Sequence, residues 1–364
     1  MGFDQFRGNG VTVTRLRQMI ARDHLPHAII LTGARGAGKF TLAQMVAKAV
    51  NCLERPMDED GLPDFCGRCR NCERIGQADA LDQRFAEAVE SRDAMREGDK
   101  RETRIFVQTH PEVLIIPPDP PQMLVKVDQV RHVIGEMYYR PAEGRQKFYI
   151  FSESNFMKEA ANALLKVLEE PPEFATLFLL AENANSLLPT IRSRCITLRL
   201  APLTSSEIAQ DLALRTEWTA AQKKLVAQLS AGAVGRARGF DLNGYLGARK
   251  DALLLLSTAL GENDHSALFR ATEAYRAGGE GKAKTDQLIA VLYSILEDLM
   301  FLKAGSAELM RNQDLQSELA AMAGQVSFGW IVRASDGLGE VQNGMRRNLL
   351  RSLSLDGYSS ALEA

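Results

Sequence analysis

The sequence lacks any run of about 18 consecutive apolar residues, which is the length that a membrane-spanning helix needs. Its opening stretch, MGFDQFRGNG, also lacks the apolar core of a signal peptide. Charge of either sign is not in excess, because the 364 residues carry a formal net charge of −2. These absences predict a cytoplasmic protein with no membrane partner. They also exclude a chain that binds nucleic acid through overall basic charge.

Cysteine is scarce, and the five cysteines are odd in number. Cys52, Cys66, Cys69 and Cys72 cluster, whereas Cys195 lies far downstream. This usage favours a metal site or free thiols over a disulfide framework. The motif C-x₂-C-x₂-C together with Cys52 supplies four thiolates, enough for a closed, structural Zn²⁺ site. An iron–sulfur cluster is the alternative, but the motif has no further cysteine followed by proline, so we favour zinc.

Short apolar runs alternate with helical patterns over the first 200 residues. This alternation is typical of βαβ units around a parallel sheet. Strands buried on both faces are expected at 28–32, 112–116, 148–151, 176–180 and 196–200. Helices are expected at 41–50, 127–137 and 158–169. After residue 200 the pattern is helical throughout.

The sequence therefore predicts an α/β protein of three domains. Residues 1–200 form the parallel-sheet domain, with a zinc module at about 52–75 and a charged, partly helical and exposed insertion at about 84–104. Residues 201–242 form a small helical domain, and residues 243–364 form a helical bundle.

The stretch LTGARGAGKFTLAQ matches the phosphate-binding loop G-x-x-x-x-G-K-[ST] except at one position. Gly33, Gly38 and Lys39 satisfy the pattern, and Gly36 lies inside the loop. Because the loop follows an expected strand and precedes an expected helix, its N–H groups and the helix dipole would face a phosphate. Phe40 replaces the hydroxyl residue that normally ligates Mg²⁺.

A second metal-handling position is altered as well. The run FYIFSES ends in Ser152 and Glu153, where an Asp that holds Mg²⁺ and a Glu that polarises water are usual. Only Glu153 remains as a remnant of that catalytic pair. Thr41 does not replace the missing hydroxyl, because one step along a helix turns the side chain by about 100°. The two losses predict weak or no ATP hydrolysis and put Mg²⁺ in doubt. They leave open whether ATP or ADP binds without turnover.

Two arginines, Arg192 and Arg194, lie in the stretch LLPTIRSRC directly before an expected strand. Such residues are commonly solvated surface side chains. The alternative is a guanidinium offered to a phosphate of another subunit. Spacing alone does not choose between them.

Several stretches together resemble the bacterial DNA polymerase III clamp-loader subunits. They are LPHAIILTG, the four-cysteine insertion, NALLKVLEEPPE and LLPTIRSRC, which lie within residues 3–203. A later run, GAVGRARG, resembles the second-sensor helix of the lid domain, with Arg236 as the sensor arginine. The resemblance implies an AAA+ RecA-like domain at 1–200, a lid at 201–242 and an oligomerising collar at 243–364.

Within that family, Gly-Lys-Phe-Thr and Ser-Glu resemble the delta-prime type, a non-hydrolysing stator, more than the gamma/tau motors. The resemblance implies a hetero-pentameric ring with gamma/tau and delta subunits, which acts on the sliding clamp and primed DNA. Arg194 would be an arginine finger for a neighbour's ATP. Gly33, Gly36, Gly38, Lys39, Thr41 and Arg236 would contact any nucleotide held by this chain. Two alternatives stay open: an ATP-hydrolysing gamma/tau-type motor, and a free-standing zinc-containing nucleic-acid-binding protein.

Overall fold

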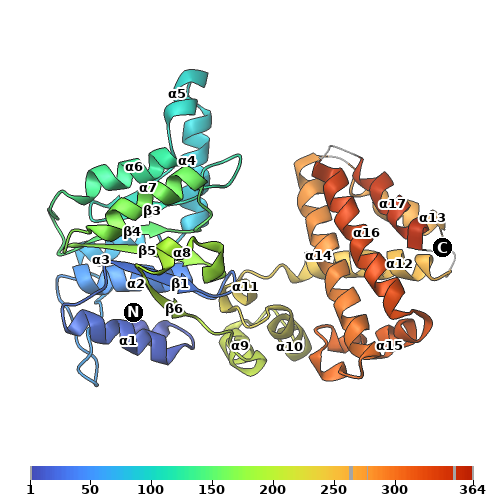
Figure 1. Cartoon of the computed structure of the whole chain (residues 1–364). Coiled ribbons are helices and arrows are strands. Elements are labelled where there is room, and N and C mark those ends of the chain that lie inside the picture. The colour runs from blue at the N-terminus through green and yellow to red at the C-terminus, as the bar shows by residue number, and fades with distance from the viewer. Residues whose placement is uncertain (1, 262–264, 277, 347–349, 363–364) are drawn as a thin grey trace. The chain divides into compact units, whose positions relative to one another are not determined.

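The computed structural model describes residues 2–261, 265–276, 278–346 and 350–362. The chain divides into two compact units (Figure 1). Unit 1 comprises Met1–Asp211 and Ala231–Arg236, and unit 2 comprises Leu212–Ser230 and Ala237–Ala364.

Unit 1 is built on a six-stranded sheet in the order β2-β3-β4-β5-β1-β6. All neighbouring strands are parallel except β2 and β3, which are antiparallel. The strands are β1 (Ala28–Thr32), β2 (Val107–His110), β3 (Val113–Ile116), β4 (Lys147–Phe151), β5 (Ala175–Ala181) and β6 (Ile196–Arg199). The five parallel strands confirm the expected α/β class.

Two strands differ from expectation. The edge strand β2 was not predicted, because its four residues, VQTH, form no apolar run. The prediction that β6 is buried on both faces was wrong, since only Leu198 of this strand is buried. The reason is its position at the edge of the sheet, beside β1. By contrast, β1, β3, β4 and β5 are buried at every position.

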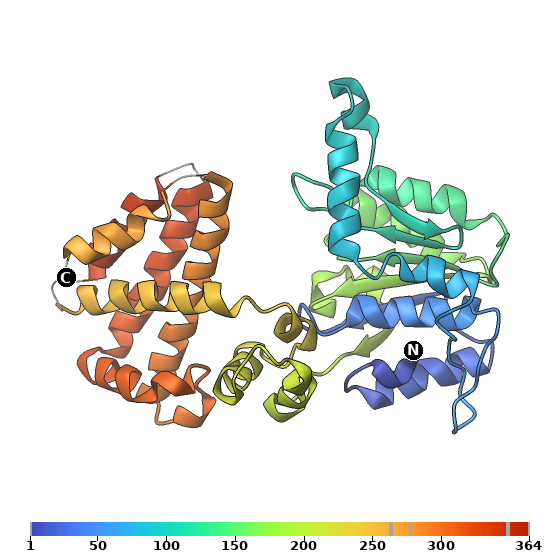
Figure 2. The ribbon, with the colours of Figure 1, turned by 180° about the vertical axis from the view of Figure 1, so that it is seen from behind.

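Helices cover both faces of this sheet (Figures 1 and 2). One apolar core joins α1, α2 and α3 to the sheet, and a second core joins α6, α7 and α8 to the opposite face. The helices of unit 1 are α1 (Gly10–Ala21), α2 (Lys39–Asn51), α3 (Arg70–Gly76), α4 (Leu81–Asp93), α5 (Glu97–Glu102), α6 (Val127–Met137), α7 (Lys158–Glu169), α8 (Pro189–Arg192) and α9 (Ser205–Asp211), and the boundary after Arg236 falls within α11 (Val234–Arg238). The result is a three-layer α/β/α unit.

The charged insertion forms α4 and α5, which extend beyond the sheet in both ribbon views (Figures 1 and 2). Most of its residues are exposed, as predicted, but Arg92 is buried. Its Nη1 donates a hydrogen bond to Oδ1 of the fully buried Asp119 at 2.9 Å. The ammonium of Lys126 lies 3.0 Å from the other oxygen of Asp119. A more exposed pair joins Arg104, the last residue of the insertion, to Asp128 of α6 at 2.9 Å. Ion pairs therefore fasten the insertion to the segment that leads into α6.

Among its described residues, the regular secondary structure of unit 2 is helical, as expected for the chain after residue 200. Its helices are α10 (Ala220–Leu229), α12 (Leu242–Ala259), α13 (His265–Glu273), α14 (Gly278–Lys303), α15 (Gln316–Gln325), α16 (Phe328–Arg346) and α17 (Arg351–Leu362). The helix α14 packs against α12, α15 and α16. It buries apolar side chains at helical spacing, including Leu288, Leu292, Ile295 and Leu299.

The region 201–242, predicted as a small helical domain, contributes to both units: α9 and residues 231–236 belong to unit 1, and α10 belongs to unit 2. The three-domain division stays a prediction.

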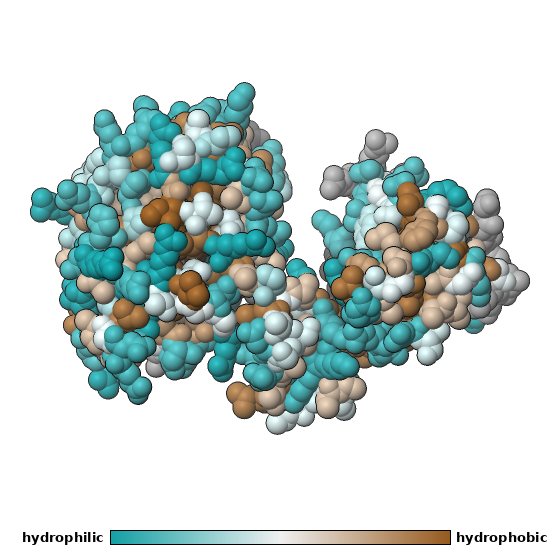
Figure 3. All heavy atoms as spheres, turned by 60° about the horizontal axis from the view of Figure 1, so that its bottom comes forward, coloured by the Kyte–Doolittle hydropathy of each residue, from teal (hydrophilic) through white to brown (hydrophobic). Residues whose placement is uncertain are grey.

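The face of unit 1 in Figure 3 is mostly polar, with apolar side chains scattered among polar ones. Scattered exposure of this kind is ordinary for a globular surface. Across the part of the chain that the structure describes, no helix has both the length and the apolar composition required to span a membrane.

The buried ion pair under the insertion predicts a matched pair of stability effects. Asp119→Ala leaves the buried guanidinium of Arg92 with only the exposed carboxylate of Asp93, 3.8 Å from its Nε, which we expect to cost about 3 kcal/mol. In a unit of this size that loss lowers the unfolding temperature by roughly 6–12 °C. Asp128→Ala removes a comparable but exposed partner of Arg104 and should cost about 1 kcal/mol or less. Thermal unfolding of the two variants checks this, and equal losses would contradict it.

Candidate functional site

The phosphate-binding loop lies between β1 and α2, at the carboxyl edge of the parallel strands. Gly38 has a φ of 90° and is the N-cap residue of α2. The N–H of Leu42 donates to the carbonyl of Gly38 at 2.9 Å, which opens the helix. The N–H groups of the first turn have no partner within a helix, and the helix dipole is positive at this end. A helix N-terminus of this kind favours a negatively charged group in front of it.

The loop packs against the segment that carries Arg236. The N–H of Gly235 donates to the carbonyl of Gly36 at 2.8 Å. A Cβ at Gly36, whose φ is 83°, would lie 2.8 Å from the backbone nitrogen of Arg236. Only glycine meets both conditions without strain. The structure thus brings Arg236, which is exposed, beside the loop.

Two carboxylates accompany the lysine of the loop. Lys39 Nζ donates to the carbonyls of Gly33 at 2.6 Å and Ala34 at 2.9 Å. Burial lowers the pKa of Lys39, and the charges of Glu182 and Glu153 oppose that effect. Glu182 was not predicted from the sequence. The available signal was its position directly after β5, the strand beside β1, because residues that follow neighbouring parallel strands share one edge of the sheet.

The two altered metal-handling positions have structural roles. Phe40 is half-buried and packs against the apolar core between the sheet and α1–α3. Ser152 is half-buried, and its N–H donates to the carbonyl of Ile116 at 3.1 Å, which continues the pairing of β4 with β3. Thr41 is exposed on the first turn of α2. This edge therefore offers N–H groups, one ammonium and two carboxylates.

Arg194 lies at the opposite edge of the sheet. It precedes β6, whereas the loop follows β1, and these parallel strands pair with Ile29 opposite Ile196. The five residues of β1 separate the two edges by about 16 Å, at about 3.3 Å per residue. Arg194 Nη2 donates to Glu169 Oε1 at 2.8 Å, and this carboxylate ends α7 at the same edge. The structure thus does not bring Arg194 to the chain's own loop.

The four clustered cysteines come together as predicted. Their sulfur atoms all lie within 4.8 Å of one another. Four sulfurs at about 2.3 Å from one tetrahedral Zn²⁺ would be about 3.8 Å apart. The N–H groups of Arg55 and Cys66 each point at Cys52 Sγ from 3.4 Å, and the N–H of Cys69 points at Cys66 Sγ from 3.2 Å. These donors stabilise thiolates, so the donor set suits a metal ion.

The pKa values of two thiols in this cluster shift in opposite directions. Burial acts to raise the pKa of Cys69, but hydrogen bonds that include the N–H groups of Cys72 and Leu53 outweigh it and lower the pKa to about 7. Burial raises the pKa of Cys72, which lies on α3. Binding of a metal cation would draw both into the thiolate form.

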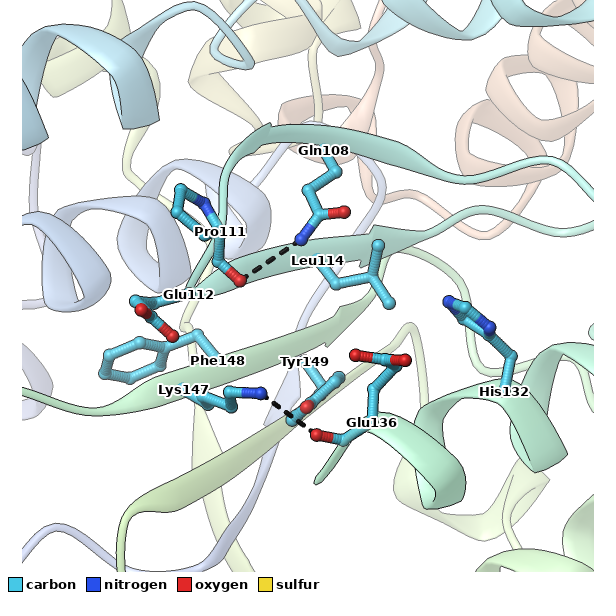
Figure 4. Close-up of a pocket in the computed structure, with 9 residues that line it drawn as sticks. All are labelled: Gln108, Pro111, Glu112, Leu114, His132, Glu136, Lys147, Phe148 and Tyr149. Atoms are coloured by element: carbon cyan, nitrogen blue, oxygen red, sulfur yellow. Dashed lines mark hydrogen bonds between the residues drawn. The ribbon is translucent and has the colours of Figure 1, made fainter. Parts of the chain in front are cut away.

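A polar pocket of about 250 Å³ lies at the amino ends of β3 and β4, next to α6 (Figure 4). Glu112 Oε1 accepts from the N–H groups of Ala142 at 2.7 Å and Glu143 at 2.9 Å. Lys147 Nζ donates to the carbonyl of Glu136 at 3.0 Å. These two charged side chains are therefore engaged within the chain, and the pocket is distinct from the phosphate-binding loop at the carboxyl edge.

The sheet order, the glycine loop after β1 and the lysine at the start of α2 define an α/β protein of the phosphate-loop class. A family model described as "DNA polymerase III, delta subunit" matches residues 8–204, which is more than half of the 364-residue chain. The chain belongs to this family and, with it, to the AAA+ clamp-loader subunits of DNA polymerase III.

Individual relatives agree with this membership. The chain is 26% identical over 301 residues to DNA polymerase III subunit delta' of Bacillus subtilis, an alignment that covers 82% of this chain and 79% of that protein. It is 28% identical over 294 residues to subunit tau of Escherichia coli, covering 80% of this chain and 37% of tau. It is 30% identical over 202 residues to subunit tau/gamma of Haemophilus influenzae, covering 55% of this chain and 24% of that protein. The alignments thus span well under half of the tau-type relatives.

A solved structure of a gamma subunit-related protein from Thermotoga maritima is 17% identical, with a TM-score of 0.39, over 97% of this chain and 98% of that chain.

The contact between the loop and the Arg236 segment predicts the effect of Gly36→Ala. The change forces a φ of 83° on alanine and brings its Cβ against a backbone nitrogen. Gly61→Ala is a matched control, because Gly61 has a φ of 71° but nothing within 4 Å of its would-be Cβ. We expect Gly61→Ala to cost about 1–2 kcal/mol and Gly36→Ala at least about 1 kcal/mol more. Equilibrium unfolding of both variants measures the difference, and equal costs would show that the close contact is absent.

Proposed function

We propose that this chain is a delta-prime-type subunit of the bacterial replicative clamp loader. It is a stator with weak or no ATP hydrolysis of its own, and Arg194 is an arginine finger for ATP bound by a neighbouring subunit. The observation that carries the proposal is the position of Arg194 at the sheet edge opposite the chain's own loop. Because the two edges of the sheet are about 16 Å apart along β1, this guanidinium does not reach the home phosphate site, and any phosphate that it contacts would belong to another chain.

The state of the loop supports the stator role. Phe40 contributes to the core where a Mg²⁺ ligand is usual, and Ser152 stands where an aspartate is usual. Two altered positions that act on the same ion remove most of the means of hydrolysis. Gly33, Gly36, Gly38, Lys39, Thr41 and Arg236 would hold the phosphates of ATP or ADP as a passive ligand. Glu153 is then a remnant of the catalytic pair and not a working base.

The partners follow from the same proposal. The relatives are subunits delta', tau and tau/gamma of DNA polymerase III. This chain would join gamma/tau and delta subunits in a hetero-pentameric ring in the cytoplasm. It would reach the sliding clamp and primed DNA through that ring. The helices after residue 243 would form the collar, and residues 201–242 the lid.

The cysteine cluster supports a structural zinc site. Four sulfurs supply all four ligands of a tetrahedral ion and leave no open position for a substrate. The ion would tie Cys52 to α3 within a segment whose Phe65 and Ile75 join the core of the sheet domain.

An ATP-hydrolysing gamma/tau-type motor is the second candidate. It is favoured by the proximity of Glu153 and Glu182 to Lys39 and by the alignment with tau over 80% of this chain. Turnover by the isolated chain separates the two candidates.

The isolated chain should show little or no ATP hydrolysis, because the positions that would hold Mg²⁺ are altered. Lys39→Ala should therefore leave the measured rate unchanged. A coupled ATPase assay of the two purified proteins measures this. Turnover that the lysine substitution abolishes would support the motor and reject the stator.

Arg194→Ala should lower the ATPase of the reconstituted loader without preventing its assembly. The active site that receives the finger should lose about 10³-fold or more in turnover. The total ATPase rate of the loader should then fall by the fraction that this active site contributes. Arg199→Ala, which removes an exposed arginine at the other end of β6, is the matched control and should have no effect. Unchanged turnover in an assembled Arg194→Ala loader would reject the finger.

The purified protein should contain about one zinc per chain and no iron. Cys72→Ser should lose the metal and destabilise the module, whereas Cys195→Ser, outside the cluster, should keep it. Elemental analysis of the three proteins tests this. Stoichiometric iron in the purified protein would show that the cysteines hold an iron–sulfur cluster and not zinc. Metal retained by Cys72→Ser would show that the four cysteines are not the metal site.

A further inference from the structure

The side chain of Arg194 is fixed by several neighbours. Its Nη1 donates to the carbonyl of Thr190 at 3.0 Å and approaches Ser193 Oγ at 3.4 Å. Its Nη2 donates to Glu169 Oε1 at 2.8 Å. The backbone is fixed as well: the N–H of Arg194 donates to Ile191 O at 3.1 Å. These contacts restrict the position and orientation of the guanidinium.

The partner carboxylate has an equally fixed origin. Glu169 is the last residue of α7, and the two prolines that follow Glu170 end this helix there. The helices α7 and α8 share one apolar core, in which Leu164, Leu168 and Ile191 are buried. The relative position of Glu169 and Arg194 is thus set by core packing, although both side chains are partly exposed, at 53% and 36%.

The remaining donors suit a phosphate. A guanidinium carries five N–H groups. Three hydrogen bonds leave two N–H groups free, which is the number that a bidentate contact with phosphate oxygens uses. An exposed ion pair contributes little to stability. The pair is therefore better suited to hold the guanidinium in one orientation than to stabilise the fold.

We propose that Glu169 is a positioning residue that orients the Arg194 guanidinium toward the ATP of the neighbouring subunit. This inference rests on the proposed function of Arg194. Because a well-oriented group lowers the barrier of the chemical step, loss of Glu169 should reduce kcat and leave KM for ATP unchanged.

The test is the steady-state ATPase of the reconstituted loader with Glu169→Ala, Glu169→Gln and Glu170→Ala. We expect Glu169→Ala to lower the Arg194-dependent part of kcat about tenfold, with KM unchanged. Glu169→Gln should keep most of that activity, since its amide oxygen still accepts the hydrogen bond from Nη2. Glu170→Ala removes the adjacent exposed carboxylate and should have no effect. In a chain that already carries Arg194→Ala, Glu169→Ala should cause no further loss.

The outcomes separate the inference from the function on which it rests. If Arg194→Ala leaves turnover unchanged, both fail. If Arg194→Ala lowers turnover and Glu169→Ala does not, the finger stands and the positioning role is overturned. Faster turnover in both Glu169 variants would show that the carboxylate competes with phosphate for the guanidinium, which also overturns positioning. If Glu169→Ala lowers kcat equally in the wild-type and Arg194→Ala chains, Glu169 acts on the structure and not through Arg194.

Discussion

The parallel pairing of β1 with β5 and β6 is the constraint on which the rest of unit 1 depends. It places Ile29 opposite both Phe178 and Ile196, with all five residues of β1 buried. Since all three strands run the same way, everything that follows them gathers at one edge and everything that precedes them gathers at the other. The glycine loop and the two acidic residues near Lys39 occupy the carboxyl edge. The SRC stretch and the end of α7 occupy the amino edge.

This separation gives the two edges different chemical capacities. The carboxyl edge holds the glycine loop and the N-terminus of α2, while the side chain of Phe40 packs against the core. The amino edge presents a guanidinium whose fork is only partly occupied. We therefore propose that the chain contributes to the reaction by facing a neighbour and not by acting on its own nucleotide. The proposed stator role follows from that imbalance.

The parts of the fold that the sequence predicted are those set by local pattern. Continuous apolar runs gave four fully buried strands, and the helical spacing of Leu288 to Leu299 gave the buried face of α14. The features that it missed depend on which segments become neighbours. The strand β2 pairs only because β3 is beside it, and β6 is exposed because no strand follows it in the sheet. The burial of Arg92 likewise depends on Asp119, 27 residues away.

The candidate site shows the same division. Residue types and spacing located the loop and the four cysteines, because glycine conformation and metal ligation demand particular residues. The contact of Gly36 with the Arg236 segment and the role of Glu182 are long-range consequences of the sheet order. Spacing could not separate a solvated Arg194 from a finger, and the sheet topology adds only that Arg194 lies at the edge opposite the home loop.

The central claim is that this chain serves a neighbour's ATP through Arg194. The most direct measurement is a structure of the assembled clamp loader bound to a non-hydrolysable ATP analogue. The account predicts the Arg194 guanidinium in hydrogen-bond contact with the terminal phosphate on the adjacent subunit. Arg194 in solvent, with a Mg²⁺-bound triphosphate and an aligned water at this chain's own loop, would contradict it.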